Sequence, residues 1–137
     1  MKLRIEKLGR ASFAAHARGH IVVSDQPQEN GGADVGMTPP ELLLASLGTC
    51  VAYYVAQFCE PRLLDCDAVE IEVEGDLMHN PGRIGAITVK VALPVELDED
   101  RLKALLRAVS HCTIHNTLTA APDIRVHVET PVAAMSS

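Results

Sequence analysis

The sequence lacks the features that direct proteins to nucleic acid or to secretion. No stretch of its 137 residues is densely basic, and 18 acidic side chains against 12 lysines and arginines give a formal net charge of −6. This balance argues against nucleic acid and anionic membrane surfaces as partners. Charges are scattered through the first ten residues, with no uninterrupted apolar core, so we expect no signal peptide.

Repeats, low-complexity tracts and interdomain linkers are also missing, which predicts a single domain over residues 1–137. The longest apolar stretch, residues 42–58, is shorter than the roughly 20 residues that a membrane-spanning helix needs. We therefore expect a buried core helix and no membrane. Four cysteines without a secretory signal predict reduced thiols in the cytoplasm, where any disulfide would be transient and functional.

The sequence does contain clear signals for strands and helices. A capping box of Thr38 and Glu41, with Pro39 between them, predicts a helix that begins after Thr38 and ends near Cys59. Alternating apolar residues predict strands, and apolar residues three and four apart predict helices. On this basis strands are expected at 3–8, 12–17, 20–24, 67–77, 87–93 and 124–128, a loop at 25–36, and further helices from 98 and at 112–120.

This order of elements indicates an α+β domain with antiparallel sheet. The strand at 67–77 has one wet face of glutamates, and Lys90 on the next strand is expected opposite that row. In the helix from 98, Leu102, Leu105, Leu106 and Val109 form an apolar stripe that is typical of a buried face.

Cys50 and Cys112 are the residues best suited to chemistry. They are 62 positions apart (112 minus 50), which excludes a zinc finger or a Cys-x-x-Cys loop, so only the fold can bring them together. Cys50 lies in mid-helix, where its own helix dipole gives a thiolate little help, so activation requires a cation from elsewhere. Otherwise Cys50 is a small core residue. Cys112 begins a short helix beside His111 and His115, which favours a thiolate there.

The cysteines and histidines also permit a metal site and a structural role. Cys112 and His115 are one turn apart and permit a metal site, although no second ligand pair appears at the spacing of zinc sites. Cys59 follows Cys50 by nine residues, about 180° around the helix, so these two cannot share a site. We interpret Cys59 and Cys66 as structural.

Two segments carry motifs of a known family: GGADVGMTPPELLLASLGTC, from Gly31 to Cys50, and HCTIHNTL, from His111 to Leu118. They resemble the OsmC/Ohr family of osmotically inducible and organic hydroperoxide resistance proteins, in particular its general OsmC-like branch. The resemblance covers nearly the whole chain. It implies the OsmC-like fold, with antiparallel sheet wrapped around central helices, and an intertwined homodimer with active sites at the subunit interface.

The resemblance also implies a cysteine-based peroxidase that reduces organic hydroperoxides in oxidative-stress defence. Cys50 would be the peroxidatic thiol, forming a sulfenic acid that condenses with the resolving thiol Cys112. A dithiol reductant, such as a lipoyl group, would restore the pair, and no bound cofactor or metal is expected. The apolar helix around Cys50 favours an organic hydroperoxide as substrate.

In such enzymes an arginine held by a glutamate stabilises the thiolate. The resemblance points to Arg18, with Arg10 as the next candidate, and to Glu41. Glu41 precedes Cys50 by nine residues, which turns it about 180° away in an ideal helix, and its capping role explains it equally well. The alternative function is a redox-sensing or small-ligand-binding OsmC-like domain with little peroxidase turnover.

Overall fold

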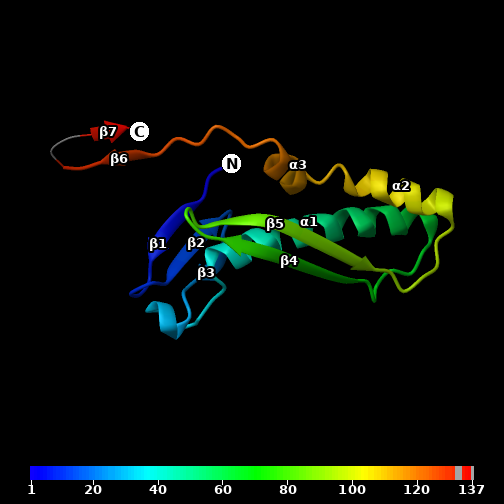
Figure 1. Ribbon diagram of the computed structural model, residues 1–137, viewed down its shortest axis with the longest axis horizontal. Coiled ribbons are helices and arrows are strands. Elements are labelled where there is room, and N and C mark those ends of the chain that lie inside the picture. The colour runs from blue at the N-terminus through cyan, green and yellow to red at the C-terminus, as the bar shows by residue number, and fades with distance from the viewer. Residues whose placement is uncertain (132–133, 137) are drawn as a thin grey trace.

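The computed structural model describes residues 1–131 and 134–136. Three helices and seven strands follow one another in the α+β order expected from the sequence (Figure 1). They are β1 (Arg4–Lys7), β2 (Phe13–Ala17), β3 (His20–Ser24), α1 (Pro39–Cys59), β4 (Glu70–Met78), β5 (Arg83–Ala92), α2 (Glu99–Val109), α3 (Thr113–Thr119), β6 (His127–Glu129) and β7 (Ala134–Ser136).

The central helix α1 begins at the predicted capping box. The Glu41 backbone N–H donates to Thr38 Oγ1 (3.4 Å), and Glu41 Oε1 accepts from the Thr38 backbone N–H (2.9 Å) and hydroxyl (2.8 Å). Two prolines occupy the first turn, where an N–H is not needed for the helix ladder. The helix ends at Cys59, and a 3-10 turn at Glu60–Arg62 follows, so both predicted ends are confirmed.

The strands form three antiparallel sheets, β1-β2-β3, β4-β5 and β6-β7. In the β4-β5 hairpin Glu72 lies opposite Lys90, the cross-strand pairing predicted from the charges. The prediction for the last strand was wrong in position, because β6 occupies His127–Glu129 and pairs with β7 instead of spanning 124–128.

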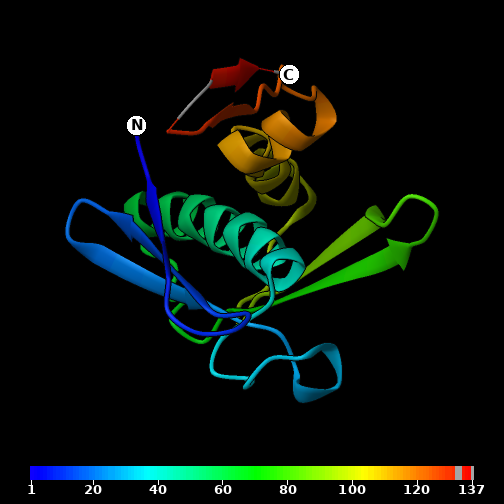
Figure 2. The same ribbon diagram turned by 90° about the vertical axis from the view of Figure 1, so that its left-hand side faces the viewer.

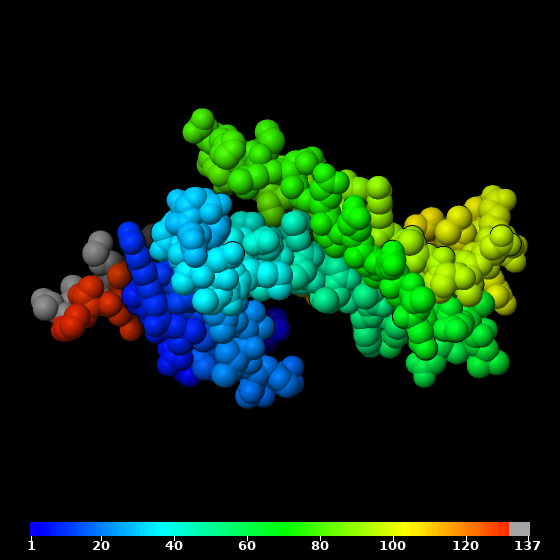
Figure 3. Space-filling model, turned by 90° about the horizontal axis from the view of Figure 1, so that it is seen from below, coloured from blue at the N-terminus to red at the C-terminus, as the bar shows by residue number. Residues whose placement is uncertain are grey.

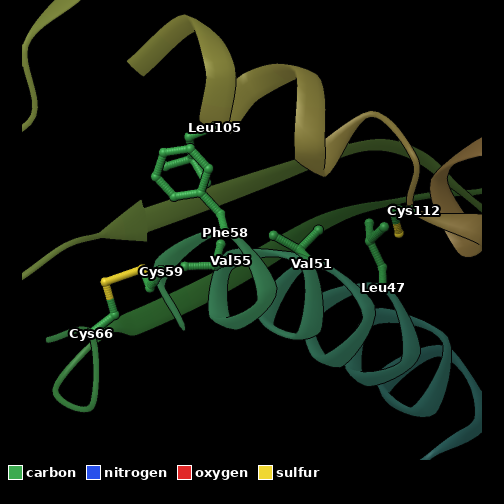
Figure 4. Packing of buried hydrophobic residues seen from close by; sticks show 8 residues of the cluster. All are labelled: Leu47, Val51, Val55, Phe58, Cys59, Cys66, Leu105 and Cys112. Atoms are coloured by element: carbon green, nitrogen blue, oxygen red, sulfur yellow. A yellow bond between two sulfur atoms is a disulfide. The ribbon is translucent and has the colours of Figure 1, made fainter. Parts of the chain in front are cut away.

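The core lies where α1 packs between α2 and the β4-β5 hairpin. Val51, Val55 and Phe58 of α1 are buried against Leu105 of α2, as Figure 4 shows. The apolar faces of β4 and β5 pack against this cluster from the other side. The predicted stripe on α2 is only partly covered, since Leu102 is 47% and Leu106 is 64% exposed.

The apolar stretch 42–58 was expected to be too short to span a membrane, but the helix that contains it is longer than that stretch. The helix has 21 residues, and with the following turn it forms a 24-residue segment with a mean hydropathy of 1.6. By length and composition alone this segment could cross a membrane, but core helices of soluble proteins meet the same criterion. The packing of α1 against α2, β4 and β5 identifies it as such a core helix.

Much of the chain outside this core is uncovered. All of β1 is exposed, and Ile5, Leu8, Ile21 and Val22 of the N-terminal sheet region are between 48% and 61% exposed. Figure 2 shows the N-terminal sheet and the β4-β5 hairpin spread apart on the two sides of α1. In Figure 3 the surface around the start of α1 lies open between these two parts. The protein is therefore extended, with the N-terminal sheet and the β4-β5 hairpin on the two sides of the core helix α1.

Cys59 and Cys66 form a disulfide, so the expectation of four reduced thiols was wrong for this pair. The turn after α1 reverses the chain and brings their Cα atoms to 6.4 Å, within the range that a disulfide needs. The bond is buried in the core, with the two residues 4% and 9% exposed (Figure 4). Cys50 and Cys112 are free thiols.

The loop at 25–36 is organised by the buried side chain of Asp25. Its carboxylate accepts backbone N–H bonds from Gln26 (2.7 Å), Ala33 (3.1 Å) and Val35 (3.1 Å), and the bond from Gln26 contributes most to lowering its pKa. Gly32 lies directly against the Gln26 carbonyl, where a Cβ would clash. These motif residues therefore set the path of the chain into α1.

Candidate active site

The fold brings Cys50 and Cys112 together, although 62 residues separate them. Cys50 lies half-buried in the middle of α1, and α3 begins against this part of α1. Cys112 is the N-cap of α3, where its Sγ accepts the backbone N–H of His115 at 3.4 Å. Its side chain is fully buried, and its thiol interacts with that of Cys50, lowering the pKa of Cys50.

This contact makes the two thiols unequal. Burial raises the pKa of Cys50, but hydrogen bonds from the Cys112 thiol and from the backbone N–H groups of Ile114 and Thr113 outweigh burial and lower the pKa. For Cys112, burial and then the bond to Cys50 raise the pKa. Cys50 is therefore the thiol that ionises first, with Cys112 as a protonated donor beside it.

The expectation that Cys112 carries the favoured thiolate was therefore wrong. Its place at the start of α3 aims the free N–H groups of Thr113 and Ile114 at Cys50, across the interface between the helices. The N-terminus of α3 therefore lowers the pKa of Cys50. The position of Cys50 in the middle of α1 gives no sign of this, because the N–H groups come from a different helix. The sequence already predicted a short helix beginning at Cys112, and this helix start was the available signal for these two N–H groups.

The expected cation does not reach Cys50 within the described chain. Arg18 lies exposed in the turn between β2 and β3, with a left-handed backbone (φ 51°). The guanidinium of Arg10 lies beside Gly31, about 3.9 Å from where a Cβ would stand. Within residues 1–131, the groups that lower the pKa of Cys50 are Cys112 and the N–H groups of α3.

Glu41 lies on a different face of α1 from Cys50. It lines a hollow of about 480 Å³ toward β4, together with Gly48 and Ile71, whereas Cys50 faces α3. In the described part of the chain its carboxylate hydrogen-bonds to Thr38, whose backbone N–H and hydroxyl lower its pKa. The half-turn separation calculated from the spacing is confirmed, and the role that the structure gives to Glu41 is the cap.

An apolar groove of about 460 Å³ is lined by neighbours of the two thiols, although neither cysteine itself lines it. Leu47 and Val51, three residues before and one after Cys50, line the groove, and Figure 4 shows Leu47 beside Cys112. The rest of the lining comes from α1, from β5 and the residue after it, from α2 and its C-cap, and from the start of α3. These residues are Val55, Val89, Val91, Leu93, Leu102, Leu105, Leu106, Val109, Ser110 and His115.

Comparison with known proteins identifies this arrangement. The family model for OsmC-like protein matches residues 31–127, which include both thiols, the capping box and the second half of the loop at 25–36. The chain belongs to the OsmC-like protein family. Proteins of this family are soluble, in agreement with α1 being a core helix. No curated protein matches the chain.

Solved structures share the OsmC-like fold at low sequence identity. An osmotic stress induced and detoxification response protein from Psychrobacter arcticus 273-4 has a TM-score of 0.76 and 19% identity, over 85% of this chain and 87% of that one. An OsmC like protein from Mycoplasma pneumoniae has 0.65 and 22%, over 88% and 89%. An organic hydroperoxide resistance protein from Legionella pneumophila has 0.56 and 17%, over 86% and 89%.

The OsmC-like site shows no metal-binding arrangement in the part of the chain that the structure describes. No three His, Cys, Asp or Glu side chains are grouped there as ligands. Of the two residues considered for a metal, Cys112 directs its thiol at Cys50, and His115 meets it through a backbone N–H. The chemistry that the arrangement supports is that of two adjacent thiols.

Proposed function

We propose that this OsmC-like protein is a thiol peroxidase that reduces organic hydroperoxides as a defence against oxidative stress. The observation that carries the proposal is the contact between Cys50, whose pKa is lowered, and Cys112, whose pKa is raised. A low-pKa, partly exposed thiol beside a second thiol is the arrangement that peroxide reduction requires. The name of the Legionella neighbour, an organic hydroperoxide resistance protein, supports the same activity.

In the proposed reaction the Cys50 thiolate attacks the distal oxygen of the hydroperoxide. An S–O bond forms as the O–O bond breaks, and the alkyl oxygen leaves with the electron pair and takes up a proton to become an alcohol. Cys112 then attacks the sulfur of the Cys50 sulfenic acid, forming the disulfide and releasing water. An external dithiol, such as a lipoyl group, reduces the disulfide and returns both thiols.

The groove beside the thiols suits an alkyl substituent on the peroxide. Ten of its twelve lining residues are leucine or valine. Each CH₂ group buried there stabilises a complex by about 0.8 kcal/mol, a gain that hydrogen peroxide cannot make. We therefore assign organic hydroperoxides as the substrate class.

We further propose that the working unit is a homodimer. The accessible surface of the chain is 10620 Å², whereas a monomeric protein of 14.7 kDa has about 7,000 Å². Counted over two chains, the excess is at least as large as the surface that permanent dimers bury, and the exposed apolar residues of the N-terminal sheet would supply such an interface. Sedimentation velocity should give about twice the chain mass at micromolar concentration, and a monomer would contradict the proposal.

Arg18 remains the proposed cation for Cys50, supplied by the second subunit. It is exposed in the turn between β2 and β3, on the sheet that the chain itself leaves uncovered. Arg18→Ala should slow the reaction of Cys50 with peroxide, whereas Arg10→Ala, which alters the guanidinium beside Gly31, should not. The opposite order of effects would transfer the role to Arg10.

We place this activity in the cytoplasm, where dithiol reductants are available. The Cys59–Cys66 disulfide can persist there because both residues are almost fully buried, which limits access to reducing thiols. Peptide mapping of protein trapped by acid and alkylated directly from cells tests this. Finding Cys59 and Cys66 bonded and Cys50 free is expected, and finding all four bonded would contradict a reducing compartment.

The decisive experiment for the peroxidase is stopped-flow measurement with tert-butyl hydroperoxide, comparing the wild type with Cys50→Ser. The wild type should react far faster than a free thiol and should turn over repeatedly with dihydrolipoamide, whereas Cys50→Ser should do neither. A wild-type rate no greater than that of a free thiol would exclude the peroxidase.

The second candidate is a redox-sensing or small-ligand-binding domain. It is favoured by the finding that no arginine contributes to the lowered pKa of Cys50 within the described chain. Both candidates predict a Cys50–Cys112 disulfide after one equivalent of peroxide. Repeated turnover with a dithiol separates the two candidates, because a sensing or binding domain would show little peroxidase turnover.

A further inference from the structure

His115 lines the apolar groove and lies in the first turn of α3, the helix that Cys112 caps. It is the third residue of α3, and its backbone N–H donates to Cys112 Sγ at 3.4 Å, which places it one helical turn from that thiol. Its side chain lines the groove together with Leu47 and Val51, the α1 neighbours of Cys50. His115 is therefore an exposed residue that lines the groove on which an alkyl group would rest, and its backbone contacts one of the two thiols.

No other residue that lines the groove can titrate. Ser110 is the other polar member, and all the rest are leucine or valine. Within the part of the chain that the structure describes, neither ring nitrogen of His115 makes a hydrogen bond or an ion pair. Both ring nitrogens are therefore available to a bound molecule.

The proposed peroxide reaction needs a proton at this position. Cleavage of the O–O bond places an electron pair on the alkyl oxygen, and an alkoxide is a strong base that leaves poorly without a proton. The Cys50 thiolate has none to give, and the proton of Cys112 is directed at Cys50. With the alkyl group in the groove, His115 is the lining residue that could give the alkyl oxygen a proton.

We infer that His115 is the general acid that protonates the leaving alkoxide, a role that rests on the proposed peroxidase function. As the Cys50 sulfur bonds to the distal oxygen and the O–O bond breaks, the alkyl oxygen takes the proton from the imidazolium N–H. The products are the Cys50 sulfenic acid, a neutral alcohol and neutral His115, which regains its proton from solvent.

Two oxidants with different leaving groups test this assignment. tert-Butyl hydroperoxide expels an alkoxide, which needs a proton, whereas peracetic acid expels acetate, which is stable without one near neutral pH. His115→Phe removes the ring N–H groups, and His115→Gln keeps an N–H donor that cannot give up its proton. His111→Phe is the matched control, because His111 precedes Cys112 and lines a different hollow beside Tyr54 and Arg62.

Both His115 variants should lose about 100-fold in the second-order rate with tert-butyl hydroperoxide, and stay within about threefold of wild type with peracetic acid. His111→Phe should match the wild type with both oxidants. The rate with peracetic acid also shows that the thiol pair remains intact, and His115→Gln carries the test if the phenylalanine variant does not fold.

Equal losses with the two oxidants, no loss with either, or the same split in His111→Phe would each overturn the assignment while leaving the peroxidase in place. A slow wild type with both oxidants is a different result, because it removes the proposed function itself and the role of His115 with it.

Discussion

The central helix carries two cysteines that the fold treats in opposite ways. Cys59, at its C-terminal end, is bonded to Cys66 and buried in the core. Cys50, nine residues earlier and half a turn around, remains a free thiol in contact with Cys112. The bonded pair holds a turn of seven residues closed, whereas the free pair joins two helices that are distant in sequence. Burial without polar partners favours a structural sulfur, and partial exposure with N–H donors favours a reactive one.

The largest expected effect is on the peroxide rate, when loss of the Cys50 thiol is compared with loss of the Cys59–Cys66 disulfide. Cys50→Ser should lower the rate with tert-butyl hydroperoxide by more than about 100-fold, because the attacking thiolate is gone. The double variant Cys59→Ser/Cys66→Ser should stay within about threefold of wild type, since that pair does not contact Cys50. Stopped-flow kinetics on the three proteins checks both. A large loss in the double variant would show that the two pairs act together.

The same variants should rank in the reverse order when the free energy of unfolding is measured. The Cys59–Cys66 bond closes a short loop, so its removal should lower the free energy of unfolding by about 2–3 kcal/mol in the chain-entropy model. Cys50→Ser, at a half-buried position, should cost less than about 1 kcal/mol. Urea unfolding of the same proteins measures this. If Cys50→Ser destabilised the protein more than loss of the Cys59–Cys66 bond, the main role of Cys50 would be packing in the core.

Removing the partner of Cys50 tests the cause of its activation. Cys112→Ala takes away a hydrogen bond to the thiolate, so the pKa of Cys50 should rise and its alkylation by iodoacetamide near neutral pH should slow by about three- to tenfold. Cys112→Ser keeps a donor and should slow it less. The pH profile of alkylation, read by mass spectrometry of the Cys50 peptide, gives the result. An unchanged midpoint in Cys112→Ala would assign the lowered pKa to α3 alone.

The smallest effect should come from the loop that leads into α1. The pKa of Asp25 is lowered in the folded chain by its backbone N–H bonds, with that of Gln26 first. Its contribution to stability is therefore present above the unfolded pKa, near 3.9, and is lost as the pH falls below it. Asp25→Asn should reduce the Tm by a few degrees at pH 7, and the difference should shrink below about pH 4.

Asp34→Asn is the control for this loop, because Asp34 has a left-handed backbone (φ 54°) that asparagine also adopts. Its Tm should match the wild type at both pH values. A difference between Asp25→Asn and wild type that persists unchanged at low pH would show that size or packing, not the charge of the carboxylate, organises the loop.

Local signals in the sequence predicted the fold well. The capping box, the alternation in β4 and β5 and the Glu72–Lys90 pairing depend on neighbouring residues, and the structure has all of them. The reversal of the two thiols could not be predicted in the same way. It depends on the N–H groups of Thr113 and Ile114 meeting Cys50 from a helix more than 60 residues away, and on Cys112 being fully buried.

The disulfide was missed for a different reason. The absence of a secretory signal was given more weight than the seven-residue spacing of Cys59 and Cys66, which a single turn closes. Glu41 lies on a different face of α1 from Cys50, as nine residues of helix lead one to expect, and a catalytic role for Glu41 stays a prediction. The homodimer and the single domain over residues 1–137 remain predictions.

The central claim is that Cys50 and Cys112 form the reactive pair and that Cys59 and Cys66 do not exchange with it. Its most direct test is peptide mapping under non-reducing conditions, before and after one equivalent of tert-butyl hydroperoxide. The account predicts that a Cys50–Cys112 link appears while the Cys59–Cys66 link is unchanged. Persistence of the free Cys50 and Cys112 thiols, or new links from either of them to Cys59 or Cys66, would contradict it.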